Sequence, residues 1–139
     1  MPLRKDAKIE VLRRTPLFSG CSKGELAAIA AIADEVEISE GKAFIREGER
    51  GREFFAVIEG TVEVRKKGRR MKIKGGNEVF GEIALVSNAP RNATVTAASP
   101  VSAFVITDRA FEGLMRRLPR LQSKVLRSLA ERVAIDEPV

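Results

Sequence analysis

Hydrophobic positions follow a helical period near the N-terminus, between residues 4 and 33. Apolar side chains recur there every three or four residues, which predicts amphipathic helices. Pro16 should end the first helix, because proline cannot continue a hydrogen-bonded helix. Ser22 and Glu25 have the spacing of a capping box, so a second helix should begin directly after Ser22.

A helical period returns between residues 108 and 134. Asp108 is a suitable N-cap residue, and Pro119 is suited to the first position of a further helix. The apolar positions in this segment are Phe111, Leu114, Met115, Leu118, Leu121, Val125, Leu126, Leu129 and Val133. The pattern therefore predicts two consecutive helices after residue 107.

Between residues 34 and 107 the pattern changes to short β-branched and apolar runs, most of them separated by glycines. These runs are 36–38, 43–46, 53–58, 61–65, 70–74, 93–97 and 101–106. Gly60 fits a tight hairpin, because glycine adopts positive φ angles at little cost. Strands at this spacing predict an antiparallel sandwich or barrel.

The chain of 139 residues suits a single domain, 1–139, with a real hydrophobic core. No apolar stretch approaches the ~20 residues of a membrane span, and the N-terminus lacks the apolar core of a signal peptide. One cysteine, Cys21, cannot form an internal disulfide. We therefore expect a cytoplasmic protein.

The absence of histidine and the single cysteine exclude several chemistries. A His-rich metal site, a haem bound through histidine and an iron–sulfur cluster all need residues that the chain lacks. Ser/His and Cys/His nucleophilic arrangements are excluded for the same reason. We expect no catalytic residues, no metal and no cofactor, and hence no enzyme.

The segment 80–94 carries the clearest candidate chemistry, because Glu82 and Arg91 stand there among small residues. A helical turn starting at Gly81-Glu82 would leave backbone N–H groups free to favour an anion. Arg91 adds planar donors suited to a phosphate, and Glu82 offers acceptors for sugar hydroxyls. The segment thus predicts a cradle for a phosphorylated sugar. The alternative is a β-turn with a surface ion pair between the two side chains.

These residues resemble the phosphate-binding cassette of cyclic nucleotide-binding domains of the catabolite activator and protein kinase A regulatory subunit type. The matching positions read Phe80-Gly81-Glu82-x-Ala84-Leu85 and Pro90-Arg91-x-Ala93-Thr94, with nine residues from the Glu to the Arg. A second segment, 47–64, resembles the jelly-roll core of the family. The resemblance implies an α+β fold: an eight-stranded antiparallel β jelly-roll barrel with N-terminal helices and C-terminal hinge and lid helices.

The resemblance also implies residue roles. The family's Glu takes the ribose 2′-hydroxyl and its Arg takes the cyclic phosphate, which implies these roles for Glu82 and Arg91. The implied ligand-binding residues are Phe80, Gly81, Glu82, Ile83, Ala84, Pro90, Arg91, Asn92, Ala93, Thr94 and, on the lid helix, Arg132. We expect Leu126, Leu129 or Val133 to cover the purine, although packing residues and a solvated arginine remain the alternative.

A cyclic nucleotide sensor or regulatory domain is the implied function. In the family, the residue after the cassette Arg tends to be small in cAMP binders, whereas a Thr at that position often supports guanine. Here the residue is Asn92, which departs from both patterns. We favour cAMP over cGMP because the chain looks like a bacterial member. The short tail after Val133 favours a stand-alone protein over an excised domain. A protein effector or a homodimer partner remains open.

Two alternative functions remain. The net charge is +6, and seven basic residues gather between 65 and 74: Arg65, Lys66, Lys67, Arg69, Arg70, Lys72 and Lys74. This stretch could contact nucleic acid or an anionic membrane. We favour a solvated hairpin around Gly68, because no aromatic residues interleave to stack on bases. The other alternative is an interaction module that has lost nucleotide binding, against which the intact Glu82 and Arg91 argue.

Overall fold

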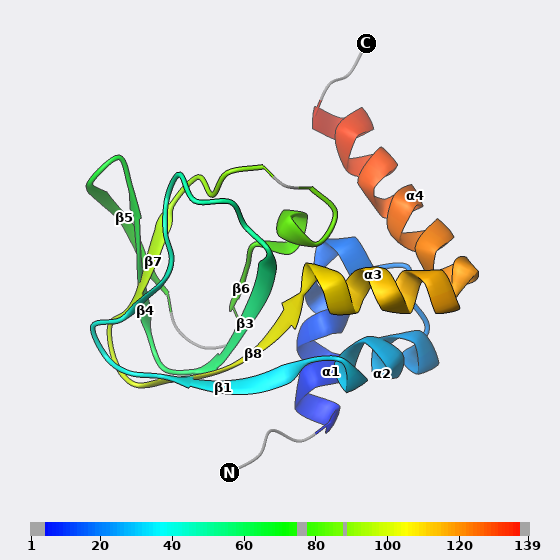
Figure 1. Ribbon diagram of the computed structural model, residues 1–139, viewed down its shortest axis with the longest axis horizontal. Helices are drawn as coiled ribbons and strands as arrows, with labels where there is room; N and C mark the ends of the chain where they lie inside the picture. The colour runs from blue at the N-terminus through cyan, green and yellow to red at the C-terminus, as the bar shows by residue number, and fades with distance from the viewer. Residues whose placement is uncertain (1–4, 75–77, 88, 137–139) are drawn as a thin grey trace. The chain divides into compact units, whose positions relative to one another are not determined.

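The computed structural model describes residues 5–74, 78–87 and 89–136, with the side chains of 72–74 and 132–136 left out. The chain divides into two compact units, with boundaries after Ile32 and after Asp108. One unit contains the helices from both ends of the chain, and the other contains the strands (Figure 1). The expected start of the first helix at Arg4 lies outside the described residues. That the whole chain acts as one domain stays a prediction.

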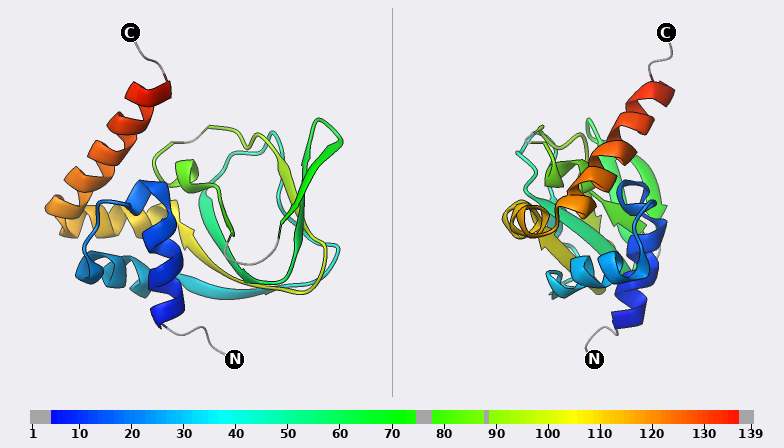
Figure 2. Two further views of the ribbon diagram at one scale, coloured as in Figure 1. Left: turned by 180° about the vertical axis from the view of Figure 1, so that it is seen from behind. Right: turned by 90° about the vertical axis from the view of Figure 1, so that its right-hand side faces the viewer.

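The strand unit is built from two four-stranded antiparallel sheets that face each other (Figure 2). The strands are β1 (Asp34–Ile38), β2 (Ala43–Ile45), β3 (Glu53–Glu59), β4 (Val62–Lys66), β5 (Arg69–Lys74), β6 (Glu78–Phe80), β7 (Thr94–Ala97) and β8 (Val101–Thr107). One sheet has the order β1-β8-β3-β6 and the other β2-β7-β4-β5. The expected eight-stranded antiparallel jelly roll is therefore confirmed, and each of the seven runs found in the sequence overlaps a strand, with ends that agree to within one residue in the runs 43–46, 61–65 and 93–97.

The core of this unit comes from alternate positions of facing strands. Phe55 is registered opposite Val105, and Val57 opposite Ala103, so that one face of β3 and β8 turns inward. The buried cluster contains Ile38, Ile45, Phe55, Val57, Val62, Val95, Ala97, Val101, Ala103 and Val105. The Phe44 ring packs edge-on against Phe55, with the ring centroids 5.1 Å apart. This core fixes the strands from which the candidate site is built.

Two tight turns depend on positive φ angles. Gly60, between β3 and β4, has a φ of 101°, and a Cβ atom there would lie 2.3 Å from the Pro100 carbonyl oxygen. Lys67 and Gly68, with φ of 53° and 78°, join β4 to β5 as a two-residue hairpin loop. The hairpin expected around Gly68 is confirmed. At Gly60 the chain does turn at a positive φ, but the expected hairpin is wrong, because β3 and β4 belong to different sheets and do not pair.

The helical unit contains α1 (Lys5–Arg14), η1 (Pro16–Phe18), α2 (Lys23–Ala31), α3 (Asp108–Arg117) and α4 (Pro119–Asp136). The breaks expected at Pro16 and Pro119 are confirmed. Asp108 is the first residue of its helix instead of the N-cap, a difference of one residue at a helix end. None of the helices described is long and apolar enough to cross a membrane.

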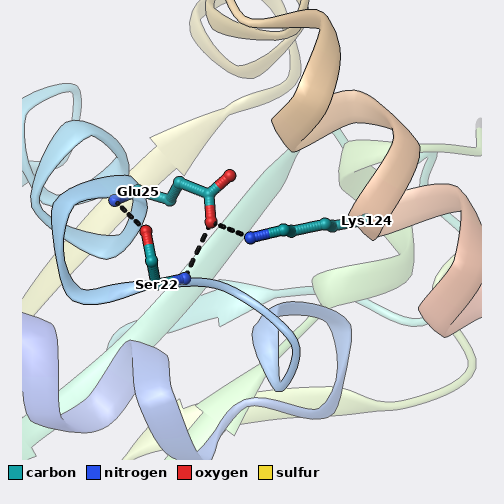
Figure 3. Close-up of polar contacts among 3 residues, drawn as sticks. All are labelled: Ser22, Glu25 and Lys124. Carbon is teal, nitrogen blue, oxygen red and sulfur yellow. Dashed lines mark hydrogen bonds and ion pairs between the residues drawn. The ribbon is translucent and has the colours of Figure 1, made fainter.

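Helix α4 is joined to the start of α2 by a charged network (Figure 3). The Ser22 Oγ atom accepts a hydrogen bond from the Glu25 N–H at 3.2 Å, and the Ser22 N–H donates to Glu25 Oε1 at 2.8 Å. The expected capping box is therefore confirmed. The Lys124 ammonium donates to the same carboxylate oxygen at 2.5 Å. Hydrogen bonding from Lys124, and next from Ser22, lowers the pKa of the Glu25 carboxyl.

We expect Glu25→Gln to change how stability depends on pH. Because the folded pKa of Glu25 lies below its ordinary 4.5, its contribution to the free energy of unfolding is fully present above about pH 4.5. That contribution is lost as the pH falls through the folded pKa. Urea denaturation at several pH values should show the gap between the natural protein and the variant shrinking in acid. A gap independent of pH would contradict the assignment, and Glu131→Gln, at an exposed position of α4, is the control.

Gly60→Ala should lower the free energy of unfolding by about 2 kcal/mol or more, because it adds a left-handed residue and a clash with the Pro100 carbonyl. Gly24→Ala is the matched control, since nothing lies within 4 Å of a Cβ at that position. Its effect should be near zero or slightly stabilising. Equal losses in the two variants, measured by denaturant unfolding, would argue against the tight turn.

Candidate ligand-binding site

The first wall of the candidate site is a short helical turn after β6. Gly81 has a φ of 80° and stands at the N-cap of η2 (Glu82–Leu85). The Ala84 N–H donates to the Gly81 carbonyl at 3.0 Å, and the side chains of Ala84 and Leu85 are buried. The helical turn expected at Gly81-Glu82 is therefore present. It places the half-buried Glu82 in the first turn, where a carboxylate is favoured.

The second wall is the segment that carries Arg91, which lies between η2 and β7. The Arg91 N–H donates to the Glu49 carbonyl at 2.8 Å, and the Arg91 carbonyl accepts from the Gly48 N–H at 2.8 Å. A β-bridge between Arg50 and Pro90 continues this pairing. The backbone of Arg91 is thus fixed by the loop between β2 and β3, a connection between residues more than 40 positions apart.

The side chain of Arg91 passes close to two glycines. A Cβ atom on Gly51 would lie 2.6 Å from Arg91 Nε, and one on Gly81 would lie 2.1 Å from Arg91 Nη1. Arg91 Nη2 donates to the Glu53 carbonyl oxygen at 2.6 Å. Any side chain at either glycine would displace the guanidinium. Gly51 and Gly81 therefore make the room in which Arg91 lies.

Partial burial changes the electrostatics of Arg91. Removal from water lowers the pKa of the guanidinium, and the nearby Glu53 carboxylate raises it in partial compensation. A cation that has lost part of its hydration gains from an anion placed beside it. The position therefore favours an anionic ligand.

Two hollows meet at this guanidinium, and both are lined by Gly81, Arg91 and Asn92. The first, of about 290 Å³, lies between the two walls and also touches Glu82, Ile83, Ala84, Ala89 and Pro90. The second, also of about 290 Å³, is mainly apolar and also touches Ile45, Val64, Met71, Phe80, Ala93 and Val95. A ligand with an anionic group, a part that carries hydrogen-bonding groups and a more apolar part matches this pair of hollows.

Backbone donors are available beside Arg91. Within the part of the chain that the structure describes, the N–H groups of Ile83, Asn92 and Ala93 have no hydrogen-bond partner. The Ile83 N–H belongs to the first turn of η2, where the helix leaves its donors unsatisfied. Such amides, together with a guanidinium, form a suitable environment for a phosphate.

The structure brings most of the predicted site residues together. Phe80, Gly81, Glu82, Ile83, Ala84, Pro90, Arg91, Asn92 and Ala93 all line one hollow or the other. Thr94 differs, because its Oγ1 accepts the Glu47 N–H at 3.0 Å and neither hollow includes it. Arg132 belongs to α4 in the helical unit, and its side chain lies outside the described residues.

Sequence reasoning missed the residues that surround Arg91 from other strands. Gly51 belongs to the loop before β3, and the Glu53 carbonyl belongs to the first residue of that strand. No local pattern connects either of them to position 91. Val64 and Val95 looked like ordinary inward strand positions. Met71 could have been noticed, because it is a large apolar side chain within a run of basic residues.

Comparisons with known proteins agree with this geometry. Residues 35–118 match the sequence model of the family described as "Cyclic nucleotide-binding domain". The cAMP-dependent protein kinase regulatory subunit of Mycosarcoma maydis is 41% identical over 118 residues, which cover 75% of this chain and 22% of that protein. The chain thus spans about a fifth of the length of this relative.

Solved structures give the same result. The N-terminal domain of a transcriptional regulator from Streptomyces coelicolor superposes with a TM-score of 0.82 at 28% identity, covering 91% of this chain and 92% of that one. The regulatory domain of Toxoplasma gondii protein kinase A, crystallised with cAMP, gives a TM-score of 0.71 at 31% identity and covers 79% and 44%.

The family match extends over more than half of the chain and includes both walls of the site, so the resemblance seen in the sequence is confirmed. Regulatory domains of this type recur among the relatives. The chain belongs to the cyclic nucleotide-binding domain family.

Proposed function

We propose that this chain binds a cyclic nucleotide, with cAMP preferred to cGMP, and acts as a sensor or regulatory domain. One observation carries the proposal: the half-buried guanidinium of Arg91 lies between two glycines, where the hollow that contains Glu82 meets a more apolar hollow. A cyclic nucleotide carries an anionic phosphate, a ribose hydroxyl and a flat base, one group for each of these three parts of the site.

The cyclic phosphate would bind at Arg91. Its single negative charge compensates the partly dehydrated guanidinium, and the unbonded N–H groups of Ile83, Asn92 and Ala93 supply further donors. Charge-assisted hydrogen bonds of this kind are stronger than neutral ones. The phosphate would then replace the Glu53 carbonyl as a partner of the guanidinium, or share the guanidinium with it.

The ribose would lie against η2, because Glu82 lines the first hollow next to Arg91. An ionised carboxylate only accepts hydrogen bonds, so it suits the 2′-hydroxyl of a ribose. A ligand that lacks this hydroxyl leaves the half-buried carboxylate without that partner. Glu82 is therefore the residue that we expect to select ribose.

The purine would occupy the apolar hollow. Val64 and Met71 lie on its β4–β5 side, and Met71 is 57% exposed although it is large and apolar. A thioether adapts its shape easily and makes favourable contacts with aromatic rings. Covering Met71 with a base would remove apolar surface from water on both partners.

Helix α4 is the proposed lid. Leu126 is a large apolar residue with 60% of its surface exposed, so it is available to contact a bound ligand. We propose that Leu126, Leu129 or Val133 covers the purine and that Arg132 is a further contact. Movement of α4 would transmit a signal only as far as ligand affinity differs between the open and covered states. A protein effector or a second copy of the chain would receive that signal.

The preference for cAMP rests on relatives and on Asn92. The related kinase subunit is named for cAMP, and the Toxoplasma structure was crystallised with cAMP. The exposed side chain of Asn92 can donate and accept, so it offers guanine no unique partner. We therefore expect the two nucleotides to differ modestly, since a large preference requires a polar group left unpaired by the wrong base.

We propose no catalytic activity and a cytoplasmic location. Cys21 is a free thiol, and burial raises its pKa to about 11, so it stays protonated and unreactive at neutral pH.

Nucleic-acid binding at residues 65–74 is favoured by charge alone. Lys66, Lys67, Arg69 and Arg70 are exposed there, while Arg65 pairs with Glu63 and the side chains of Lys72 and Lys74 lie outside the described residues.

Arg91→Ala should weaken the binding of cAMP and of cGMP by about thirtyfold to several thousandfold, equivalent to about 2–5 kcal/mol, because the phosphate would be buried without its charged partner. Isothermal titration calorimetry measures both affinities. Arg116→Ala is the control, since it also removes one arginine but at an exposed helical position. Unchanged affinity in Arg91→Ala would remove the basis of the proposal.

Gly51→Ala should weaken cAMP binding by about five- to a hundredfold, because its Cβ occupies the space of the Arg91 guanidinium. In the Arg91→Ala background the same change should have little further effect. This non-additivity, measured by calorimetry on all four proteins, separates a role through Arg91 from general damage. Gly20→Ala, with open space around its Cβ, is the control. Additive losses would contradict the role assigned to Gly51.

A further inference from the structure

Glu47 makes hydrogen bonds to two segments at the edge of the candidate site, the start of β7 and the tip of the β4–β5 hairpin. Its backbone N–H donates to Thr94 Oγ1 at 3.0 Å, at the start of β7 directly after the Arg91 segment. Its carboxylate Oε1 accepts the Lys67 N–H at 2.8 Å, at the tip of the β4–β5 hairpin. Glu47 itself lies in the loop between β2 and β3. One residue thus connects two segments that are separated by 27 positions in the chain.

Within the described part of the strand unit, few other backbone hydrogen bonds hold the tip of the hairpin. Strand β7 pairs with β4 only as far as Arg65, which is registered opposite Thr94. Beyond that point Lys66 pairs only with Arg69 of its own hairpin. Figure 1 shows this hairpin extending past the end of β7. The bond to Glu47 therefore fixes a part of the hairpin that the sheet does not.

The same loop fixes the other side of the site. Gly48 and Glu49, which follow Glu47, hold the backbone of Arg91 through two hydrogen bonds of 2.8 Å. The loop is therefore bonded to the Arg91 segment and to the hairpin at once. The apolar hollow is lined from both segments: Val64 and Met71 come from the hairpin, and Asn92 comes from the Arg91 segment.

A carboxylate is well suited to this position. Its hydrogen bond to a backbone N–H is charge-assisted, which strengthens the bond relative to a neutral one. The tip also carries four exposed cations, Lys66, Lys67, Arg69 and Arg70, whose mutual repulsion a nearby negative charge reduces. Charge and geometry therefore act in the same direction to keep the hairpin against the loop.

We propose that Glu47 is a positioning residue for the ligand: it keeps the tip of the β4–β5 hairpin against the loop that fixes the Arg91 segment, and so keeps Met71 at the wall of the hollow that takes the purine. This inference rests on the proposed function. Without the carboxylate the end of the hairpin beyond β7, with Met71 beside it, moves away from the base. Affinity for cAMP then falls.

The test compares Glu47→Ala with Glu47→Gln. The amide oxygen of Gln can still accept the Lys67 N–H, whereas Ala removes the acceptor. We expect Glu47→Ala to weaken cAMP binding by about three- to thirtyfold and Glu47→Gln to remain near the natural affinity. Glu40→Ala is the control for loss of one negative charge, because Glu40 is exposed in the turn between β1 and β2.

Amide hydrogen exchange on the ligand-free proteins provides the second readout. The Lys67 N–H should be protected in the natural protein and in Glu47→Gln and exchange faster in Glu47→Ala, while amides of β3 and β8 stay unchanged. If Glu47→Ala does not fold, Thr94→Val removes the other hydrogen bond of Glu47 and should weaken cAMP binding in the same direction.

Three results would overturn the inference. Natural affinity in Glu47→Ala, together with faster exchange of the Lys67 amide, would show that the hydrogen bond between Glu47 and Lys67 does not position the ligand. Equal losses in Glu47→Ala, Glu47→Gln and Glu40→Ala would assign the effect to net charge. If the natural protein binds neither nucleotide, the proposed function fails and this inference fails with it, whereas the first two results leave the proposed function intact.

Discussion

The placement of one half-buried guanidinium governs the candidate site. Arg91 has lost part of its hydration, so its pKa is lowered, and the molecule compensates with the Glu53 carbonyl and carboxylate. The space for it exists only because Gly51 and Gly81 have no side chains. A cation held in this way is pre-organised for an anion, since little further ordering is needed when the anion arrives. The two hollows on either side of it then determine what else the ligand must carry.

The barrel provides this placement through backbone pairing over long sequence distances. The loop between β2 and β3 bonds to Arg91 on both its N–H and its carbonyl, and Glu47 extends that pairing to the β4–β5 hairpin. The core of inward-facing aliphatic and aromatic residues keeps the contributing strands in register. The site is therefore a product of the whole strand unit, although its recognisable residues fall within fifteen consecutive positions.

The sequence predicted those features that depend on local chemistry. Pro16, Pro119 and the Ser22–Glu25 capping box marked helix boundaries correctly, and glycines marked the turns at Gly60 and Gly68. Strand β6 (Glu78–Phe80) was missed as a pattern, because three residues are too few to show alternation, and only the family resemblance supplied an eighth strand. Glu82 and Arg91 were found because their neighbours form a motif. Gly51, Glu53 and Glu47 were not, since their roles arise from tertiary hydrogen bonds and packing that no local spacing records. That Thr94 contacts the ligand stays a prediction, and its hydroxyl also accepts a hydrogen bond from the Glu47 N–H, which the sequence did not indicate.

In our proposal the two hollows and Arg91 together form one site for a cyclic nucleotide. Calorimetric titration of the natural protein with cAMP and cGMP, side by side under one buffer and salt condition, tests it most directly. We expect saturable binding of one nucleotide per chain, with cAMP modestly tighter than cGMP. Absence of saturable binding of either nucleotide at millimolar concentration would contradict it.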